Sequence, residues 1–245
     1  MSESLLLDMQ ALRIEARGPD GKPFRIVDDV DLQLKRGEVL GLIGESGAGK
    51  STIGLASMNY ARTGCAITGG KIIFDGTDLR TLTEDQVRAM RGVNAAYIAQ
   101  SAAASFNPAK RLNDQVTEAA VRHNVMNRGD AVKRAQELYD KLDLPDPDNI
   151  GRRYPHQVSG GQLQRVMSAM AMTCGPDLRV LDEPTTALDV TTQIEVLATV
   201  RDLIRTNNTA ALYITHDLAV VAQIADRIMV LQYGKLVEVG ETNQI

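Results

Sequence analysis

The chain has 245 residues, of which 44% are hydrophobic and 24% charged, and this composition excludes a disordered or low-complexity protein. The net charge of -4 at pH 7 argues against a broad basic surface, so we expect no nucleic acid partner. No apolar run approaches the roughly 20 residues that cross a bilayer, and the first residues lack the basic region of a secretory signal. The sequence therefore predicts a soluble, cytosolic chain, and its two cysteines indicate neither a disulfide framework nor a metal site.

The first 98 residues are rich in strand patterns. Strands are predicted over 5–16, 26–34, 38–43, 71–74 and 94–99. A helix is expected from Lys50, directly after a glycine-rich segment. A second, short helix is expected from Thr83, because Thr83 and Gln86 have the spacing of a capping box.

From about residue 100 to 174 the hydrophobic pattern becomes helical, with helices predicted over 112–125, 130–144 and 160–173. Strands and helices then alternate. Strands are predicted over 178–184, 210–215, 227–232 and 235–239, with helices at Ile194, Leu197, Val200 and Ile204 and again after His216. This alternation predicts an α/β fold with a mainly parallel sheet. We expect a core of residues 1–98 and 175–245 and an inserted helical lobe of residues 99–174.

The segment "GESGAGKS", Gly44 to Ser51, fits the pattern G-x-x-x-x-G-K-[ST] of a P-loop. Glycines let several backbone N–H groups converge on phosphate oxygens, and the helix that follows adds the positive end of its dipole. Lys50 would reach the β- and γ-phosphates, and Ser51 would bind Mg²⁺. A plain turn before a helix is the alternative. The expected nucleotide-binding residues are Gly44, Glu45, Ser46, Gly47, Ala48, Gly49, Lys50, Ser51 and Thr52.

A carboxylate pair follows the predicted strand in "LRVLDEP". Asp182 would face Mg²⁺ at the carboxyl edge of the sheet, where open α/β sheets bind ligands. Glu183 would face the attacking water and act as general base. The alternative is an acidic strand end before a turn at Pro184. With a P-loop in the same chain, we interpret the pair as catalytic.

The segment "VSGGQLQR" places two glycines at the start of a predicted helix. Ser159 and Gln162 have capping-box spacing, which is a purely structural alternative. Capping does not explain Gly160 and Gly161, because each glycine weakens a helix by up to about 1 kcal/mol relative to alanine. Close approach of an anion to the helix end would explain them. The sequence therefore indicates a second phosphate-binding segment in the helical lobe.

In this order of motifs the chain resembles the ATP-binding cassette ATPases of membrane transporters. Besides the P-loop and the Asp182-Glu183 pair, it contains Gln100 in "YIAQSAAASFNP", the signature "SGGQ" at Ser159 to Gln162, "ALD" ending at Asp189, and His216 in "YITHD". The resemblance implies a P-loop NTPase core with an N-terminal antiparallel β-subdomain and an inserted α-helical subdomain. It also implies a head-to-tail dimer in which each ATP lies between one P-loop and the other signature.

The resemblance also assigns roles. Gln100 would ligate Mg²⁺ and sense the transmembrane partner, and His216 would contact the γ-phosphate and orient the water with Glu183. Asp189 would lie at the nucleotide site of the dimer. The implied catalytic residues are thus Glu183, His216 and Gln100, the Mg²⁺ ligands are Ser51, Gln100 and Asp182, and the nucleotide is ATP.

Three segments are most similar to the oligopeptide, dipeptide and nickel uptake branch of this family: "QSAAASFNPAKRL", "RRYPHQVSGGQLQRV" and "LDEPTTALDV". This branch implies an ATP-driven importer with transmembrane permease subunits and, indirectly, an extracytoplasmic solute-binding protein, with the cassette on the cytoplasmic face of the membrane. The alternatives are the ATPase of an exporter or of a multi-enzyme complex, and a soluble ATPase acting on nucleic acid or the ribosome. The long coiled-coil insertions that would favour the last are absent from the sequence.

Three features depart from the family pattern. Ala16 stands where relatives commonly place an aromatic residue against adenine, and Arg17 or Phe24 are the alternatives for that role. Arg179 interrupts an otherwise apolar strand, where a buried charge is costly without a partner. The chain ends at "VEVGETNQI", before the C-terminal tail that this branch usually has, so we expect either a minimal cassette or the first half of a tandem protein.

Overall fold

The computed structural model describes residues 4–18, 21–184, 197–198, 201–202, 204–206 and 208–245. The chain divides into two compact units, each described by itself below. The first unit contains Met1–Arg88 and Ile204–Ile245, and the second contains Ala89–Leu203. The predicted helical region, 99–174, lies wholly within the second unit.

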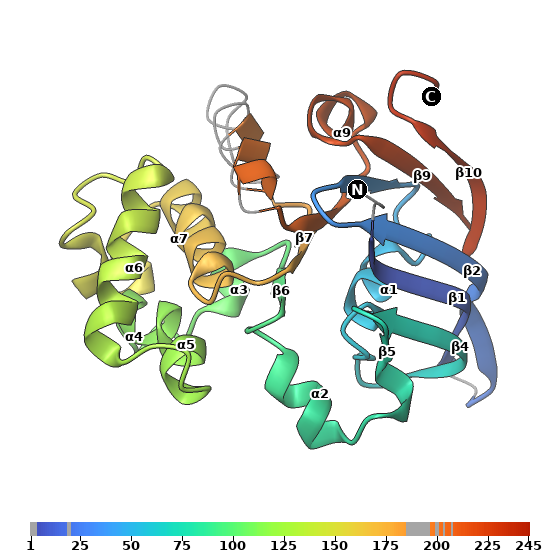
Figure 1. Ribbon diagram of the computed structural model, residues 1–245, viewed down its shortest axis with the longest axis horizontal. Helices are drawn as coiled ribbons and strands as arrows, with labels where there is room; N and C mark the ends of the chain where they lie inside the picture. Colours follow the sequence, from blue (N-terminus) through green and yellow to red (C-terminus); the bar gives the residue numbers. More distant parts are fainter. Residues whose placement is uncertain (1–3, 19–20, 185–196, 199–200, 203, 207) are drawn as a thin grey trace. The chain divides into compact units, whose positions relative to one another are not determined.

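An antiparallel sheet occupies the N-terminal part of the first unit (Figure 1). Its strands, in spatial order, are β2 (Pro23–Lys35), β1 (Leu5–Arg17), β4 (Cys65–Phe74) and β5 (Thr77–Asp78). Val30, Leu32 and Leu34 are fully buried and alternate with outward-facing residues, as the period of two predicts. The sheet confirms the three strands predicted in this region and matches the antiparallel β-subdomain that the resemblance implies.

The rest of the first unit is built on strands in the order β10-β9-β3-β8. The elements are β3 (Val39–Ile43), α1 (Lys50–Ala56), η1 (Leu79–Thr81), β8 (Ala210–Ile214), α9 (Leu218–Ile224), β9 (Arg227–Gln232) and β10 (Lys235–Glu241). β3 pairs in parallel with both β8 and β9, and β10 returns antiparallel to β9. The carboxyl ends of β3 and β8 therefore lie at one edge of the sheet.

The second unit combines a pair of parallel strands with a group of helices (Figure 1). Its elements are β6 (Ala95–Ile98), α3 (Ala102–Ser105), α4 (Leu112–Val116), α5 (Glu118–Arg122), α6 (Arg128–Lys141), η2 (Ile150–Arg152), η3 (Pro155–Gln157), α7 (Gly160–Met172) and β7 (Leu178–Asp182). α7 is central to the unit, because it contacts α3, α4, α6 and β6.

One predicted helix differs in detail from the prediction, and the start of another confirms it. The single helix expected over 112–125 is two short helices separated at Thr117, whose hydroxyl donates to the Asn113 carbonyl at 2.7 Å. The Thr117 N–H donates to the same carbonyl at 3.1 Å, so the carbonyl accepts two hydrogen bonds. Back-bonding of this kind often bends helices. At α2 (Glu84–Met90) the predicted capping box is confirmed, because Thr83 N–H donates to Gln86 Oε1 at 2.9 Å and Gln86 N–H to Thr83 Oγ1 at 3.4 Å.

The helix predicted around residues 194–204 is described only in part. Residues 197–198, 201–202 and 204–206 are helical, and Leu197 and Ile204 are buried as their spacing predicts. Ile194 and Val200 lie outside the described residues. Among the helices that the structure does describe, none has the length and apolar character needed to cross a membrane.

Arg179 lies within β7 and is 3% exposed. Its pKa is lowered to about 10, because burial removes water from the guanidinium and the like charge of Arg134 lies nearby, while Asp177 offsets part of the effect. The structure therefore confirms that a charged residue interrupts this buried strand, as the sequence pattern indicated.

Candidate nucleotide-binding site

The P-loop connects β3 to α1 and packs closely on neighbouring backbone. Gly44 has φ 151°, and a Cβ at this position would lie 2.1 Å from the Leu231 carbonyl oxygen. Gly49 has φ 99°, and a Cβ there would lie 3.0 Å from the Ile26 carbonyl oxygen. Both positions therefore require glycine, and the loop is held tightly against β9 and β2.

Lys50 is buried, and its ammonium group lies over the loop. Nζ donates to the Gly44 carbonyl at 2.6 Å and to the Glu45 carbonyl at 2.9 Å. The Ala48 N–H donates to the same Glu45 carbonyl at 3.1 Å, which closes the turn. A fixed cation on a glycine-rich turn is a donor set that fits a phosphate group.

His216 follows β8 and is exposed. The neighbouring Thr215 N–H donates to the Leu42 carbonyl at 3.2 Å, so the chain after β8 stays attached to the end of β3. Asp217 then caps α9, accepting from the Ala219 N–H at 2.8 Å and the Val220 N–H at 3.2 Å. In the first unit, His216 and the P-loop thus come from the same edge of the sheet.

The carboxylate pair stands at the end of β7, beside the end of β6. The two strands are parallel, with Tyr97 opposite Val180 and Ile98 opposite Leu181. The Tyr97 hydroxyl donates to Oδ2 of Asp182, and Gln100 Nε2 donates to Oε2 of Glu183 at 3.3 Å. The second unit therefore brings together three predicted site residues, Gln100, Asp182 and Glu183.

Tyr97 is a polar contact of this site that the sequence does not reveal. A tyrosine in an apolar strand predicts core packing. Its hydroxyl meets a carboxylate only because two strands more than 80 residues apart in the sequence pair in this register. Only knowledge of that pairing could have identified it.

Glu183 has a backbone conformation that few non-glycine residues adopt. Its φ is 48°, in the left-handed region, which costs roughly 1–2 kcal/mol for a residue with a Cβ. Strained residues of this kind cluster at functional sites, where the surrounding structure holds them. The conformation fits a side chain that must be aimed in one direction.

The signature segment begins α7. Ser159 Oγ accepts from the Gln162 N–H at 3.2 Å, and Gln162 Oε1 accepts from the Ser159 N–H at 3.1 Å, so the predicted capping box is confirmed. At Gly160, by contrast, no atom of the described residues, apart from its chain neighbours and its own helix backbone, lies within 4 Å of the position that a Cβ would take. Packing within the chain therefore does not require a glycine there.

The predicted site residues divide between the two units. The P-loop and His216 belong to the first unit, and Gln100, the signature segment and the Asp182-Glu183 pair belong to the second. Asp189 lies outside the described residues. Within the described part of the chain, no group of three or more His, Cys, Asp or Glu side chains could hold a metal. The predicted Mg²⁺ ligands include one carboxylate, which fits an ion that takes its other oxygens from phosphate and water.

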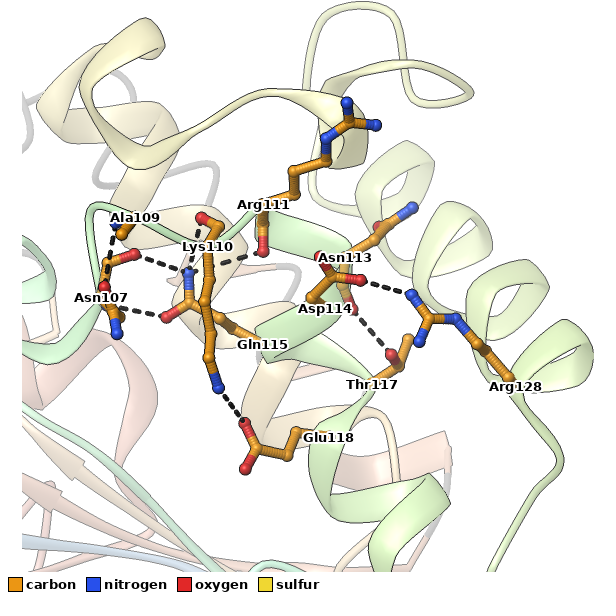
Figure 2. A network of polar contacts seen from close by, with 10 residues as sticks. All are labelled: Asn107, Ala109, Lys110, Arg111, Asn113, Asp114, Gln115, Thr117, Glu118 and Arg128. Atoms are coloured by element: carbon orange, nitrogen blue, oxygen red, sulfur yellow. Dashed lines mark hydrogen bonds and ion pairs between the residues drawn. The ribbon is translucent and has the colours of Figure 1, made fainter.

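A groove of about 560 Å³, lined by charged side chains and by apolar surface, opens on the second unit. Figure 2 shows the contacts beside it: Arg128 pairs with Asp114 at 2.5 Å, and Lys110 pairs with Glu118 at 3.8 Å. Exposed ion pairs of this kind contribute little to stability. The groove is therefore lined by charges of both signs that pair with one another.

Opposite Ala16, on the neighbouring strand, stands Phe24. Phe24 is 52% exposed, whereas most of the large apolar side chains of this sheet are buried. Of the two alternatives for a contact with adenine, Phe24 thus offers an exposed aromatic ring in register with Ala16.

A glycine-rich loop between a strand and a helix, with a lysine held over it, is the arrangement typical of P-loop nucleotide-binding proteins. The carboxylate pair at the end of a second parallel strand is typical of the hydrolases in this class. The family model for the ABC transporter matches residues 27–186, and the chain belongs to this family.

Curated relatives span nearly the whole chain. It is 40% identical over 240 residues to the "Dipeptide transport ATP-binding protein DppD" of Escherichia coli (strain K12), covering 98% of this chain and 73% of the relative. It is 38% identical over 242 residues to the "Oligopeptide transport ATP-binding protein OppD" of Salmonella typhimurium, covering 99% and 72%.

The fold is that of solved cassettes. The structure of "the ATP-binding cassette MJ0796 bound to ADP and Pi", a dimeric post-hydrolysis state, superposes with a TM-score of 0.86 at 23% identity, covering 96% of this chain and 98% of that one. The predicted ABC ATPase fold is thereby confirmed.

Proposed function

We propose that this chain is the ATP-hydrolysing subunit of an importer of dipeptides or oligopeptides. The observation that carries the proposal is the 40% identity to a dipeptide transport ATP-binding protein over 98% of the chain. The P-loop geometry and the carboxylate pair support the ATPase part independently. The relatives' names support the peptide part.

In this proposal each residue of the site has a chemical role. Lys50 and the backbone N–H groups of the P-loop bind the phosphates, and Ser51, Gln100 and Asp182 hold Mg²⁺. Mg²⁺, when bound, neutralises charge on the phosphate oxygens. Glu183 accepts a proton from the attacking water, and His216 orients that water. Phe24 stacks on adenine.

We further propose that the active form is a dimer of cassettes. Ser159, Gly160, Gly161 and Gln162 of one cassette, with Asp189, bind the ATP that the P-loop of the other cassette holds. The open space at the Cβ position of Gly160 supports this role, because an approaching phosphate needs the space that a Cβ would take.

Gly160→Ala tests the signature segment. The substitution is expected to abolish ATP-dependent dimerisation in a Glu183→Gln background and to lower turnover at least ~10-fold. The melting temperature should stay the same or rise, because alanine is favoured over glycine in helices by up to about 1 kcal/mol. Light scattering and thermal melting measure the two effects.

Gly129→Ala, in the first turn of α6, is the matched control and should dimerise normally. Normal dimerisation of Gly160→Ala would contradict the role.

The membrane partners follow from the same proposal. Permease subunits receive the closing motion of the cassettes through the helical unit, where the groove lined by Lys110, Glu118 and Arg128 offers a charged surface. An extracytoplasmic solute-binding protein delivers the peptide to the permease. The cassette then works at the cytoplasmic face of the membrane.

The test is reconstitution. The chain is tagged in its own cells, purified with the membrane subunits that bind it, and placed in proteoliposomes with ATP on the cassette side. We expect labelled dipeptides or oligopeptides to accumulate with ATP hydrolysis, and the Glu183→Gln complex to give neither. Transport of a non-peptide solute alone, or co-purification without any membrane subunit, would contradict the proposed function.

A further inference from the structure

The contact between Tyr97 and Asp182 has no counterpart among the predicted motifs. Tyr97 lies in β6, and its hydroxyl donates a hydrogen bond to Oδ2 of Asp182 at the end of β7. We infer that Tyr97 is a positioning residue, which fixes the Asp182 carboxylate in the orientation that binds Mg²⁺. The inference rests on the proposed function, in which Asp182 is a metal ligand.

Strand geometry directs this contact. Tyr97 is paired with Val180, and Asp182 lies two residues further along β7, on the same face of the strand as Val180. Gln100 and Glu183 form a separate contact at 3.3 Å, three residues beyond Tyr97 and one beyond Asp182. The two contacts therefore join different pairs of side chains, and the tyrosine side chain is long enough to reach Asp182 across the diagonal.

The arrangement leaves Asp182 able to bind a metal. An ionised carboxylate has two oxygens and about four acceptor sites, so a hydrogen bond accepted by Oδ2 is compatible with a cation bound by the same carboxylate. Asp182 is 3% exposed, so water has little access to replace a missing donor. The terminal torsion of an aspartate is broad, and a hydrogen bond from the tyrosine hydroxyl favours one orientation of the carboxylate.

Partners that orient a metal ligand affect metal affinity strongly, because their mutation typically costs about 10- to 100-fold. Tyr97→Phe removes the hydroxyl and keeps the ring. We expect Mn²⁺, as a probe for Mg²⁺, to bind the ADP-loaded protein about 10-fold more weakly in this variant. The free Mn²⁺ signal in electron paramagnetic resonance measures this without any turnover. ADP affinity in EDTA should stay unchanged.

Tyr139→Phe is the matched control. Tyr139 lies in the same unit and is buried, and its hydroxyl donates to Asn113 Oδ1 at 2.9 Å, so the variant also removes one hydrogen bond of a tyrosine hydroxyl. It should change the melting temperature but leave Mn²⁺ affinity unchanged. Equal Mn²⁺ affinities in Tyr97→Phe and Tyr139→Phe, with Asp182→Asn still weakening binding, would overturn the inference and leave the proposed function intact.

A double-mutant cycle separates positioning from folding. If Tyr97 acts through Asp182, Tyr97→Phe has no further effect on Mn²⁺ affinity in an Asp182→Asn background. An equal loss in both backgrounds would overturn the inference. If Asp182→Asn alone leaves Mn²⁺ affinity unchanged, the metal role of Asp182 in the proposed function is wrong, and the inference fails with it.

Discussion

Glu183→Gln is expected to lower ATP turnover by at least ~100-fold while ATP binding is retained, since general bases typically contribute about 10²- to 10⁴-fold. The amide has the shape of the carboxylate, and its oxygen can still accept from Gln100 Nε2, which donates to Glu183 at 3.3 Å. It cannot take a proton from water. ATP should therefore hold the two cassettes closed as a stable dimer.

The mass of the Glu183→Gln chain, by light scattering after gel filtration with and without Mg·ATP, measures the closed dimer. Glu137→Gln is the matched control, because it removes the same charge from an exposed ion pair with Arg134 at 3.2 Å in the same unit. The control should hydrolyse ATP normally. A monomer that still binds ATP would contradict a dimer formed by this chain alone, and normal turnover would contradict the general base.

The elements with strong local patterns could be predicted from the sequence. Period-two alternation at Val30, Leu32 and Leu34 identified β2, and the spacing of Ser159 and Gln162 identified the start of α7. These signals are local, because they depend on residues two to four positions apart. The break at Thr117 was missed because hydrophobic period does not report a hydroxyl that bonds back to the preceding turn.

The same difference between local and non-local signals explains why only part of the candidate site could be proposed from the sequence. The P-loop is a contiguous motif, so its residues could be assigned without knowing the fold. The contacts to Asp182 and Glu183 depend on the pairing of β6 with β7, which the sequence does not state. Gln100 was reached only through resemblance, and Tyr97 not at all, because no local pattern links either residue to a strand 80 positions away.

Lys50→Ala is expected to weaken ATP binding by about 10- to 100-fold, because a hydrogen bond to a charged group contributes roughly 1.5–3 kcal/mol. Lys50 is a buried cation, and its bonds to the Gly44 and Glu45 carbonyls hold that charge against the loop that we propose binds the phosphates. Titration calorimetry with ATP measures the loss. AMP, which lacks the β- and γ-phosphates, should bind the variant and the unaltered chain equally.

Two further variants test whether the loss of ATP affinity comes from the charge of Lys50 itself. Lys71→Ala removes an exposed lysine from β4 in the same unit and should leave ATP affinity unchanged. Lys50→Arg keeps the charge, but its planar fork does not fit a site made for a compact ammonium, so we expect an intermediate affinity. Since Lys50 also bonds to the loop, the melting temperature of each variant is measured alongside. Unchanged ATP affinity in a folded Lys50→Ala chain would mean that the loop does not hold the β- and γ-phosphates, and the nucleotide site would have to be sought elsewhere.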